Sequence, residues 1–347
     1  MHVTDLETPS VLINLDRMEN NIRRMQDRCN ELGIAFRPHI KTHKIPDIAK
    51  MQIEAGAVGI ACQKVTEAQV FAEAGINDIQ IPYNIVGEKK TARLADLALY
   101  NRVTVSADHP ITIAGLSDAA AALDIRIRVM VDLATDIQRT GAPVDEIVML
   151  AKKIDDDDHL HFAGLLVYPS TASNRPAIQE VLLRLHQAGI GVETVSGGGY
   201  GAFLQADQVP ELTEIRVGTY LFNDMSSVHK GWTTIDDCAM HVAATVVSRP
   251  SPDRMILDAG SKTLAADRVK DTHGYIVEYP EARIYQLSEE HAHVDLSQCV
   301  ERPVVGERVH VIPVHTCVVS NLHNQLYGVR GDQVEVVWDV AARGKVW

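Results

Sequence analysis

The sequence has no long apolar run and no excess of positive charge. No apolar stretch approaches the roughly 18–20 residues that a membrane-spanning helix needs, so we expect no membrane partner. The start, MHVTDLETPSVLINLD, has no basic segment followed by an apolar one, which argues against a secretory signal. The 33 Lys and Arg residues are outnumbered by 46 Asp and Glu residues. The resulting formal charge of −13 repels phosphate backbones, so we expect no nucleic-acid partner.

The sequence also lacks a cysteine framework. Its five cysteines are odd in number and scattered along the chain, which argues against a set of disulfides and suits a reducing compartment. We therefore expect a cytoplasmic protein. The composition is that of an ordinary globular chain, and 347 residues are enough for one large domain or two ordinary ones.

The pattern of apolar residues divides the chain near residue 234. Up to that point short β-rich runs alternate with helical stretches, which predicts right-handed βαβ units and a parallel sheet. Eight runs are candidate strands, at residues 35–41, 58–63, 79–84, 102–107, 125–132, 161–168, 192–197 and 214–218. Eight such strands favour a closed (β/α)8 barrel of the TIM type over an open sheet. The predicted fold class is therefore α/β, with this barrel at residues 1–234.

Residues 235–347 contain mostly strand patterns, which predicts a second, antiparallel β domain. The candidate strands are residues 240–249, 255–260, 275–280, 282–288, 308–320 and 333–342. Gly331-Asp332 separates LYGVR from QVEVVW and is typical of a hairpin turn.

The first predicted strand ends in the basic segment RPHIKTHK. Alternation along a strand places Arg37, His39 and Lys41 on one face. The chemistry of a closed barrel gathers at the carboxyl ends of its strands, and an ammonium group is costly to bury there without a partner. Such a lysine can form a Schiff base with an aldehyde such as pyridoxal phosphate (PLP). An exposed basic turn is the alternative.

Glycine-rich segments follow the seventh and eighth predicted strands. SGGG begins at Ser196, and RVGTY ends at Tyr220. A phosphate site after strands 7 and 8 is a recurring barrel feature, and glycine lets the backbone approach an anion closely. A flexible turn is the alternative. Arg139 and Tyr168 also lie near the predicted barrel mouth, where they could contact a pyridine ring, although surface and packing roles are alternatives.

In the second domain, His315-Thr316-Cys317 lies on a predicted strand. The spacing of two residues puts imidazole and thiol on one face, where they could hold one metal ion. Sulfur plus imidazole favours Zn²⁺ with an open position for substrate, and core packing is the alternative. The segment from Glu290 to His293 also carries carboxylate and imidazole groups, and we interpret it as a solvated loop or a support for other residues.

Together these motifs resemble the D-threonine aldolase/D-serine dehydratase-like family of fold-type III PLP enzymes, which shares its barrel with alanine racemase. The resemblance runs over essentially the whole chain, through RPHIKTHK, AGAVGIACQKVTEAQVFAEAGI, VSGGGYG, EIRVGTYLFND, DAGSKTLAAD, LSEEHAHV and PVHTCVVSN. It implies that Lys41 carries PLP and that His315 and Cys317 hold the metal. The further cofactor-binding residues that it implies are Arg139, Tyr168, Ser196, Gly198, Gly199, Thr219 and Tyr220. It also implies a homodimer in which the β domain of one subunit meets the barrel mouth of the other.

The chain departs from the family pattern at three positions. Ala134 stands where we expect glycine, Val314 stands where asparagine commonly precedes the metal histidine, and Tyr200 stands where threonine is frequent. These departures concern substrate specificity more than cofactor binding.

By this resemblance the protein is a lyase that acts on a small D-configured β-hydroxy amino acid with PLP and one divalent metal ion (Zn, or Mn or Mg). Our main interpretation is an aldolase of the D-threonine type. The metal acidifies the β-hydroxyl, His43 removes its proton, and glycine and an aldehyde leave. The alternative is a D-serine or D-3-hydroxyaspartate dehydratase, in which Lys41 removes the Cα proton and the products are a 2-oxo acid and ammonia. The cysteine in the metal pair is expected in that branch.

Two other functions stay open. A non-catalytic PLP carrier would need neither the β domain nor the metal pair. A racemase would need a second base opposite Lys41, and the sequence assigns none.

Overall fold

The computed structural model describes residues 1–347 and contains two compact units. The barrel unit comprises Met25–Lys41, Pro46–Gly218 and Gly344–Trp347, and the β unit comprises Met1–Arg24, Thr42–Ile45 and Thr219–Arg343. The chain therefore passes between units several times, whereas the sequence pattern predicts a single boundary at residue 234. One reason is strand β1 (Ser10–Asn14), which pairs with β10 and β16 of the β unit.

Eight parallel strands form the sheet of the barrel unit, in the order β2-β9-β8-β7-β6-β5-β4-β3. A parallel bridge between His39 and Ala61 joins the two ends of this order, and the Pro38 carbonyl accepts the Ala61 N–H at 2.8 Å. The sheet thus closes on itself, which confirms the predicted barrel. Its strands are β2 (Ala35–Phe36), β3 (Ile60–Ala61), β4 (Asp78–Asn84), β5 (Arg102–Ala107), β6 (Ile127–Leu133), β7 (Leu160–Val167), β8 (Thr194–Gly198) and β9 (Glu214–Arg216).

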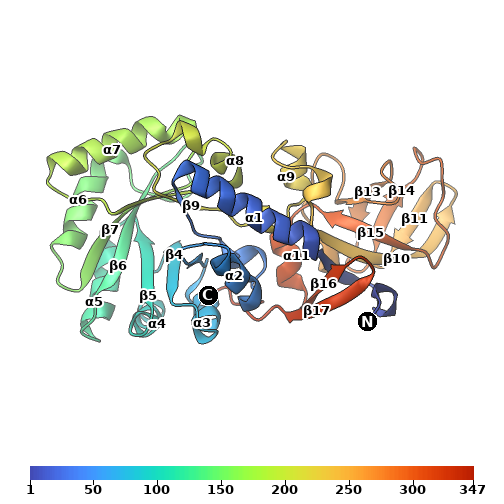
Figure 1. The fold of residues 1–347 in the computed structure, drawn as a ribbon, viewed down its shortest axis with the longest axis horizontal. Coiled ribbons are helices and arrows are strands. Elements are labelled where there is room, and N and C mark those ends of the chain that lie inside the picture. Colours follow the sequence, from blue (N-terminus) through green and yellow to red (C-terminus); the bar gives the residue numbers. More distant parts are fainter. The chain divides into compact units, whose positions relative to one another are not determined.

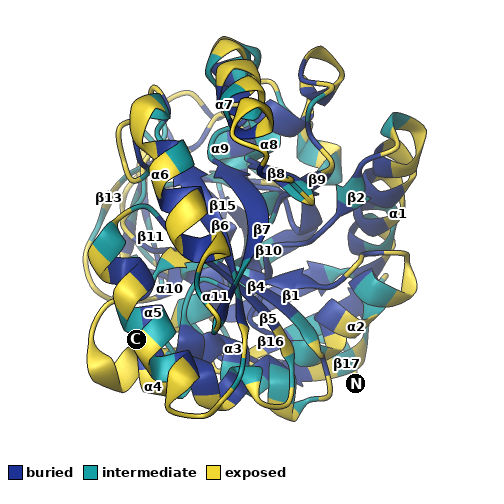
Figure 2. Ribbon diagram, turned by 90° about the vertical axis from the view of Figure 1, so that its left-hand side faces the viewer, coloured by how far each residue is buried: buried dark blue, intermediate teal, exposed yellow.

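Helices cover the outside of the barrel strands (Figure 1). In α6, Ile147, Leu150, Ala151 and Ile154 are buried at helical spacing, so one stripe of the helix faces the sheet. Figure 2 shows β6 and β7 as buried, while α6 and α7 expose their outer turns. No helix of the chain combines the length and the apolar character that crossing a membrane requires. The helices before residue 218 are α1 (Leu15–Leu32), α2 (Pro46–Glu54), α3 (Val65–Glu73), α4 (Glu88–Ala98), α5 (Pro110–Ala121), α6 (Val144–Asp155), α7 (Arg175–Gln187) and α8 (Tyr200–Phe203).

The β unit contains a nine-stranded, mostly antiparallel sheet, as predicted. Its main path is β13-β14-β11-β10-β1-β16-β17, and β15 pairs with both β10 and β12. Arg330 pairs with Gln333 across a two-residue turn, which confirms the hairpin at Gly331-Asp332. The strands are β10 (Met240–Ser251), β11 (Arg254–Leu257), β12 (Gly274–Ile276), β13 (Arg283–Leu287), β14 (Ala292–Asp295), β15 (Arg308–Pro313), β16 (Gln325–Arg330) and β17 (Gln333–Asp339), and the helices are α9 (Met225–His229), α10 (Ser261–Leu264) and α11 (Thr316–Leu322).

Several predicted strands are too long, and two of them end before candidate site residues that the sequence placed on the strand. The strand expected at 35–41 ends at Phe36, and Lys41 lies in the 3-10 helix η2 (Ile40–Thr42). The strand expected at 308–320 ends at Pro313, and His315 precedes α11 as its N-cap residue. Proline cannot donate a ladder hydrogen bond, and both segments contain one near the point where the strand stops. The loop expected around His293 is also partly wrong, because Ala292–Asp295 forms β14.

Candidate active site

Lys41 follows β2 at the carboxyl end of the barrel. Because it lies in η2 rather than on a strand, the strand alternation that grouped it with Arg37 and His39 does not apply. Its backbone N–H points to His39 Nδ1 at 3.5 Å, and the side chain is half-buried. Lys41 therefore lies at the rim where barrel enzymes place their reacting groups.

His39 lies among cations at this rim. Its Nε2 lies 3.0 Å from Gln63 Oε1. Burial lowers the pKa of His39 well below its usual value, and the positive charges of Lys41, Arg216 and Arg139 lower it further. The imidazole is therefore neutral at physiological pH, and the surrounding cations create a positive potential suited to an anionic ligand.

The loop after β6 carries Arg139 to the Tyr168 ring, so the structure brings these two residues together. The Arg139 guanidinium carbon lies 4.4 Å from the ring centroid, which is a cation–π geometry. Thr135 Oγ1 donates to the Tyr168 carbonyl at 2.7 Å, and Thr140 Oγ1 donates to Asp132 Oδ2 at 2.8 Å. These bonds tie both ends of the loop and hold the exposed Arg139 over the ring.

Arg216 on β9 is a buried cation that sequence reasoning missed. It donates from Nη1 to the Ser196 carbonyl at 2.8 Å and to the Ser196 hydroxyl. Burial lowers the pKa of Arg216 to about 10, and burial raises the pKa of nearby Asp132 to about 6. The available signal was an arginine inside the apolar run EIRVG. Ser196 is fully buried and also donates to Glu214 at 2.5 Å, so its hydroxyl supports the barrel interior.

Gly198 and Gly199 provide space, and their N–H groups are already used. The Gly198 N–H donates to Ser170 Oγ at 3.1 Å, and the Gly199 N–H donates to the Arg216 carbonyl at 3.1 Å. A Cβ on Gly198 would lie 3.0 Å from both Arg216 Nη2 and Tyr168 Cδ2. Gly199 has φ +106°, a conformation that L side chains rarely adopt. The two glycines therefore keep the backbone bare beside Arg216 and Tyr168.

The remaining cofactor residues of the sequence prediction belong to the β unit. Thr219 and Tyr220 form the start of the 3-10 helix η5 (Thr219–Leu221). Tyr220 is 2% exposed, and Thr219 is half-buried. The Thr219 carbonyl accepts the Asn223 N–H at 2.8 Å, which fixes this turn.

The predicted metal pair surrounds the start of α11. A hydrogen bond to Cys317 raises the pKa of His315 to about 9, and the negative charges of Cys317, Asp224 and Asp267 outweigh the opposing effect of burial. His315 Nδ1 lies 3.3 Å from Asp267 Oδ1, and Cys317 Sγ lies 3.2 Å from Thr42 Oγ1. The structure therefore brings the imidazole and the thiol together, through a helix N-terminus rather than through a shared strand face.

The donor types at this pair suit a soft divalent ion. Imidazole nitrogen and thiolate sulfur are the ligands that Zn²⁺ prefers. No group of three or more His, Cys, Asp and Glu side chains in the chain is arranged to hold a metal ion.

His43 is fully buried in the β unit. Its Nδ1 accepts the Ile45 N–H at 3.1 Å, so any proton that this ring takes up must go to Nε2.

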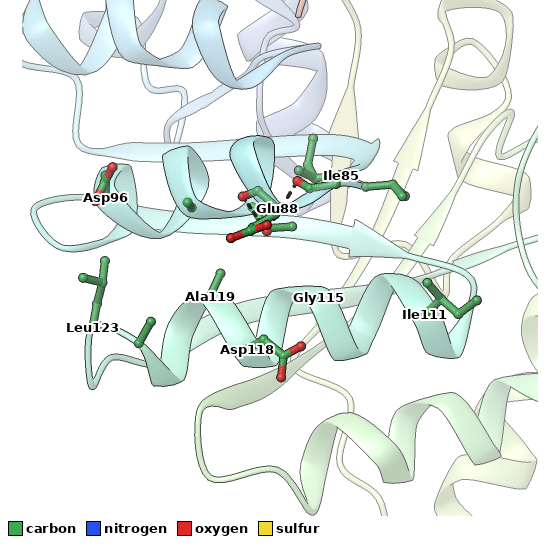
Figure 3. Close-up of a pocket in the computed structure, with 13 residues that line it drawn as sticks. Ile85, Glu88, Asp96, Ile111, Gly115, Asp118, Ala119 and Leu123 are labelled. Carbon is green, nitrogen blue, oxygen red and sulfur yellow. Dashed lines mark hydrogen bonds between the residues drawn. The ribbon is translucent and has the colours of Figure 1, made fainter.

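A separate cavity of ≈ 690 Å³ lies between α4 and α5 (Figure 3). Its wall combines the apolar Ile111, Ala119 and Leu123 with the carboxylates of Asp96 and Asp118. None of the predicted site residues lines it, so it is not part of the candidate active site.

The chain is similar to known lyases over its whole length. The family model of the alanine racemase N-terminal domain matches residues 13–226, and a model described as a putative serine dehydratase domain matches residues 239–329. D-threonine aldolase of Arthrobacter sp. is 34% identical over 98% of this chain and 93% of its own length. The 3-hydroxy-D-aspartate aldolase of Paracoccus denitrificans (strain Pd 1222) is 30% identical over 99% of this chain and 94% of its own length. The crystal structure of D-threonine aldolase from Filomicrobium marinum matches with a TM-score of 0.91 and 32% identity, covering 99% of this chain and 97% of that one.

Proposed function

The chain belongs to the PLP-dependent family that shares the alanine racemase N-terminal barrel, and within that family we propose that it is an aldolase of D-configured β-hydroxy amino acids. The products are glycine and an aldehyde, as in a D-threonine aldolase. The observation that supports this assignment best is the 34% identity to D-threonine aldolase of Arthrobacter sp. over 98% of the chain.

The residues of the barrel mouth fit PLP in charge and shape. The phosphate and phenolate groups of PLP are anionic and suit the positive potential around His39. The bare backbone at Gly198 leaves space that a Cβ would fill. We propose that Lys41 anchors the cofactor aldehyde and that Arg139 and Tyr168 border its ring. When bound, PLP supplies an electron sink for the charge that develops at Cα.

The His315 and Cys317 pair would hold one divalent ion, with Zn²⁺ favoured by the sulfur ligand and Mn²⁺ or Mg²⁺ as alternatives. The ion would acidify the substrate β-hydroxyl. We propose His43 as the base that accepts the hydroxyl proton, at Nε2, because its Nδ1 already accepts the Ile45 N–H. Loss of that proton leads to cleavage of the Cα–Cβ bond.

A dehydratase is the second candidate, and the metal pair favours it. Residues 239–329, which include His315 and Cys317, match a putative serine dehydratase domain. In this reaction Lys41 would take the Cα proton at Nζ, and the β-hydroxyl would leave as water. D-serine or D-3-hydroxyaspartate would then give a 2-oxo acid and ammonia.

A product assay separates these functions. Protein loaded with PLP and a divalent metal receives D-threonine, D-serine and D-threo-3-hydroxyaspartate in parallel, with L-threonine and the Lys41→Ala variant as controls. Glycine with a stoichiometric aldehyde establishes the aldolase, whereas 2-oxo acid with ammonia establishes the dehydratase. Stoichiometric PLP binding without any product would overturn both and point to a cofactor carrier.

We further propose that the protein works as a cytoplasmic homodimer. All five cysteines are free thiols, which suits a reducing compartment. Sedimentation of the PLP-loaded protein at several concentrations measures the subunit number, and a monomer at all of them would contradict the dimer.

A further inference from the structure

Two sequence motifs of the β unit, DAGSKTLAAD at residues 258–267 and LSEEHAHV at residues 287–294, have no role in the site described above. They are bound to each other. The Lys262 N–H donates to the Glu289 carbonyl at 3.1 Å, and Lys262 Nζ lies 2.7 Å from Glu289 Oε2. A Cβ on Gly260 would lie 2.3 Å from the Glu289 carbonyl oxygen, so only glycine allows this close approach. The first motif is therefore held against the turn between β13 and β14.

The held motif contacts both ends of α11, the helix that carries the predicted metal pair. At the end of the helix, His323 Nε2 donates to the Thr263 carbonyl at 3.2 Å. At its start, His315 Nδ1 lies 3.3 Å from Asp267 Oδ1. The backbone of Asp267 is fixed in turn, because its carbonyl accepts a bond from His273 Nδ1 at 3.0 Å. The carboxylate of Asp267 thus reaches the imidazole from a segment that is tied down independently.

This contact determines which ring nitrogen of His315 can bind a metal ion. An ionised carboxylate only accepts hydrogen bonds, so the proton of a neutral ring stays on Nδ1, beside Asp267. A metal-bound imidazole is neutral, which leaves Nε2 as the nitrogen with a free electron pair. The two side chains are each 40% exposed, so the ring is accessible.

We propose that Asp267 is a positioning residue of the metal pair: its carboxylate accepts the Nδ1 proton bond of His315 and thereby directs Nε2 toward the ion. The motifs at residues 258–267 and 287–294 hold this carboxylate in place. Asp267 acts through His315 and is not itself a ligand. This inference rests on the proposed function, because the metal pair is assigned there.

The test measures the dissociation constant of Zn²⁺ from the PLP-loaded protein by competition with a chromophoric chelator. Asp267→Ala raises this constant about 10- to 100-fold, because the ring loses the partner that fixes its tautomer and orientation. In Asp267→Asn the amide oxygen can still accept the Nδ1 bond in a side chain of the same shape. Its constant therefore stays closer to the wild-type value than to that of Asp267→Ala.

Asp271→Ala is the matched control. It removes the same charge four residues further along the chain, where Asp271 pairs with Arg283 at 2.6 Å and does not act on His315. Its Zn²⁺ dissociation constant stays at the wild-type value. Excess Zn²⁺ restores product formation in Asp267→Ala, since both ligands remain, whereas damage to the fold would lower activity at every Zn²⁺ concentration.

Three outcomes separate this inference from the proposed function. If Asp267→Asn binds Zn²⁺ as weakly as Asp267→Ala, the carboxylate acts as a ligand or through its charge, and the positioning role is refuted. If Asp267→Ala binds Zn²⁺ as tightly as an active wild type does, the positioning role is refuted while the proposed function stands. If no lyase activity is found but Zn²⁺ binding depends on Asp267 as described, the positioning role stands and the proposed function fails.

Discussion

Glu214 is the centre of a buried polar network inside the barrel. It is 5% exposed. Its Oε2 accepts a bond from Arg37 Nε at 2.8 Å, and its Oε1 accepts bonds from Ser196 at 2.5 Å and from Gln80 at 3.1 Å. Burial alone would raise the pKa of Glu214, but the charge of Arg37 and the bond from Ser196 hold it below its usual value. The ionised carboxylate is therefore an integral part of the folded barrel.

Replacing Glu214 with Gln removes the charge and keeps the shape. Arg37 would then keep only Asp78, at 2.7 Å, as its anionic partner. Breaking a buried ion pair from one side costs about 3–5 kcal/mol, and because Asp78 remains we expect a loss of about 3 kcal/mol. Because the pKa of Glu214 is lower in the folded state than its usual value of 4.5, ionisation of this carboxyl stabilises the fold above pH 4.5, and this stabilisation is lost as the pH falls further. The difference in free energy of unfolding between Glu214→Gln and the wild type therefore shrinks below pH 4.5.

Urea denaturation at pH 7 and at pH 4 measures both effects. The control is Glu180→Gln, since Glu180 is half-exposed and pairs with Arg184 one helical turn away. Surface pairs of this kind contribute less than about 1 kcal/mol. If Glu214→Gln destabilises no more than Glu180→Gln at pH 7, the argument from the buried network is wrong.

Four further predictions concern the candidate site. Lys41→Ala abolishes the visible absorbance band of the PLP-loaded protein, and a persisting band would disprove the lysine assignment. Gly198→Ala places a Cβ within 3.0 Å of two side chains, so PLP affinity measured by fluorescence titration falls about tenfold, whereas unchanged affinity would contradict the steric role. Burial raises the pKa of Asp132 from 3.8 to about 6, so above pH 6 the ionised Asp132 lowers the free energy of unfolding by up to about 3 kcal/mol. Asp132→Asn is therefore more stable than the wild type at pH 7 but not below pH 4, and equal urea midpoints at pH 7 would refute this. Replacing His315 and Cys317 with Ala together removes bound metal and activity but leaves PLP in place, and loss of PLP would instead indicate a structural role.

The strand predictions succeeded where apolar periodicity is strong. The run RVTVSA forms β5 with the predicted bounds, because its Val, Thr and Val residues are buried on both faces of a parallel sheet. The predictions failed where a proline or a cap ends an element. Lys41 lies five residues beyond the end of β2 and His315 two residues beyond the end of β15, so strand alternation did not predict the geometry of either residue.

Other parts of the site carry no local pattern. Arg216 bonds to Ser196 on the neighbouring strand, and no spacing along the chain connects these two residues. Asp267 reaches His315 from a distant segment, which only the folded β unit brings near. Sequence reasoning assigned SGGG to a phosphate cradle built from N–H groups, whereas the structure uses the N–H groups of Gly198 and Gly199 for internal bonds.

The sequence by itself determined the α/β barrel and the antiparallel β unit, and it supplied the residue types that we propose to hold a cofactor and a metal, because periodicity and side-chain chemistry are local properties. Only the tertiary structure decided that β1 joins the β unit, that Arg139 stacks on Tyr168, and that burial and the charges of nearby cations lower the pKa of His39. These relations depend on strand order around the closed barrel and on burial. Both arise from contacts between segments that are far apart in the chain.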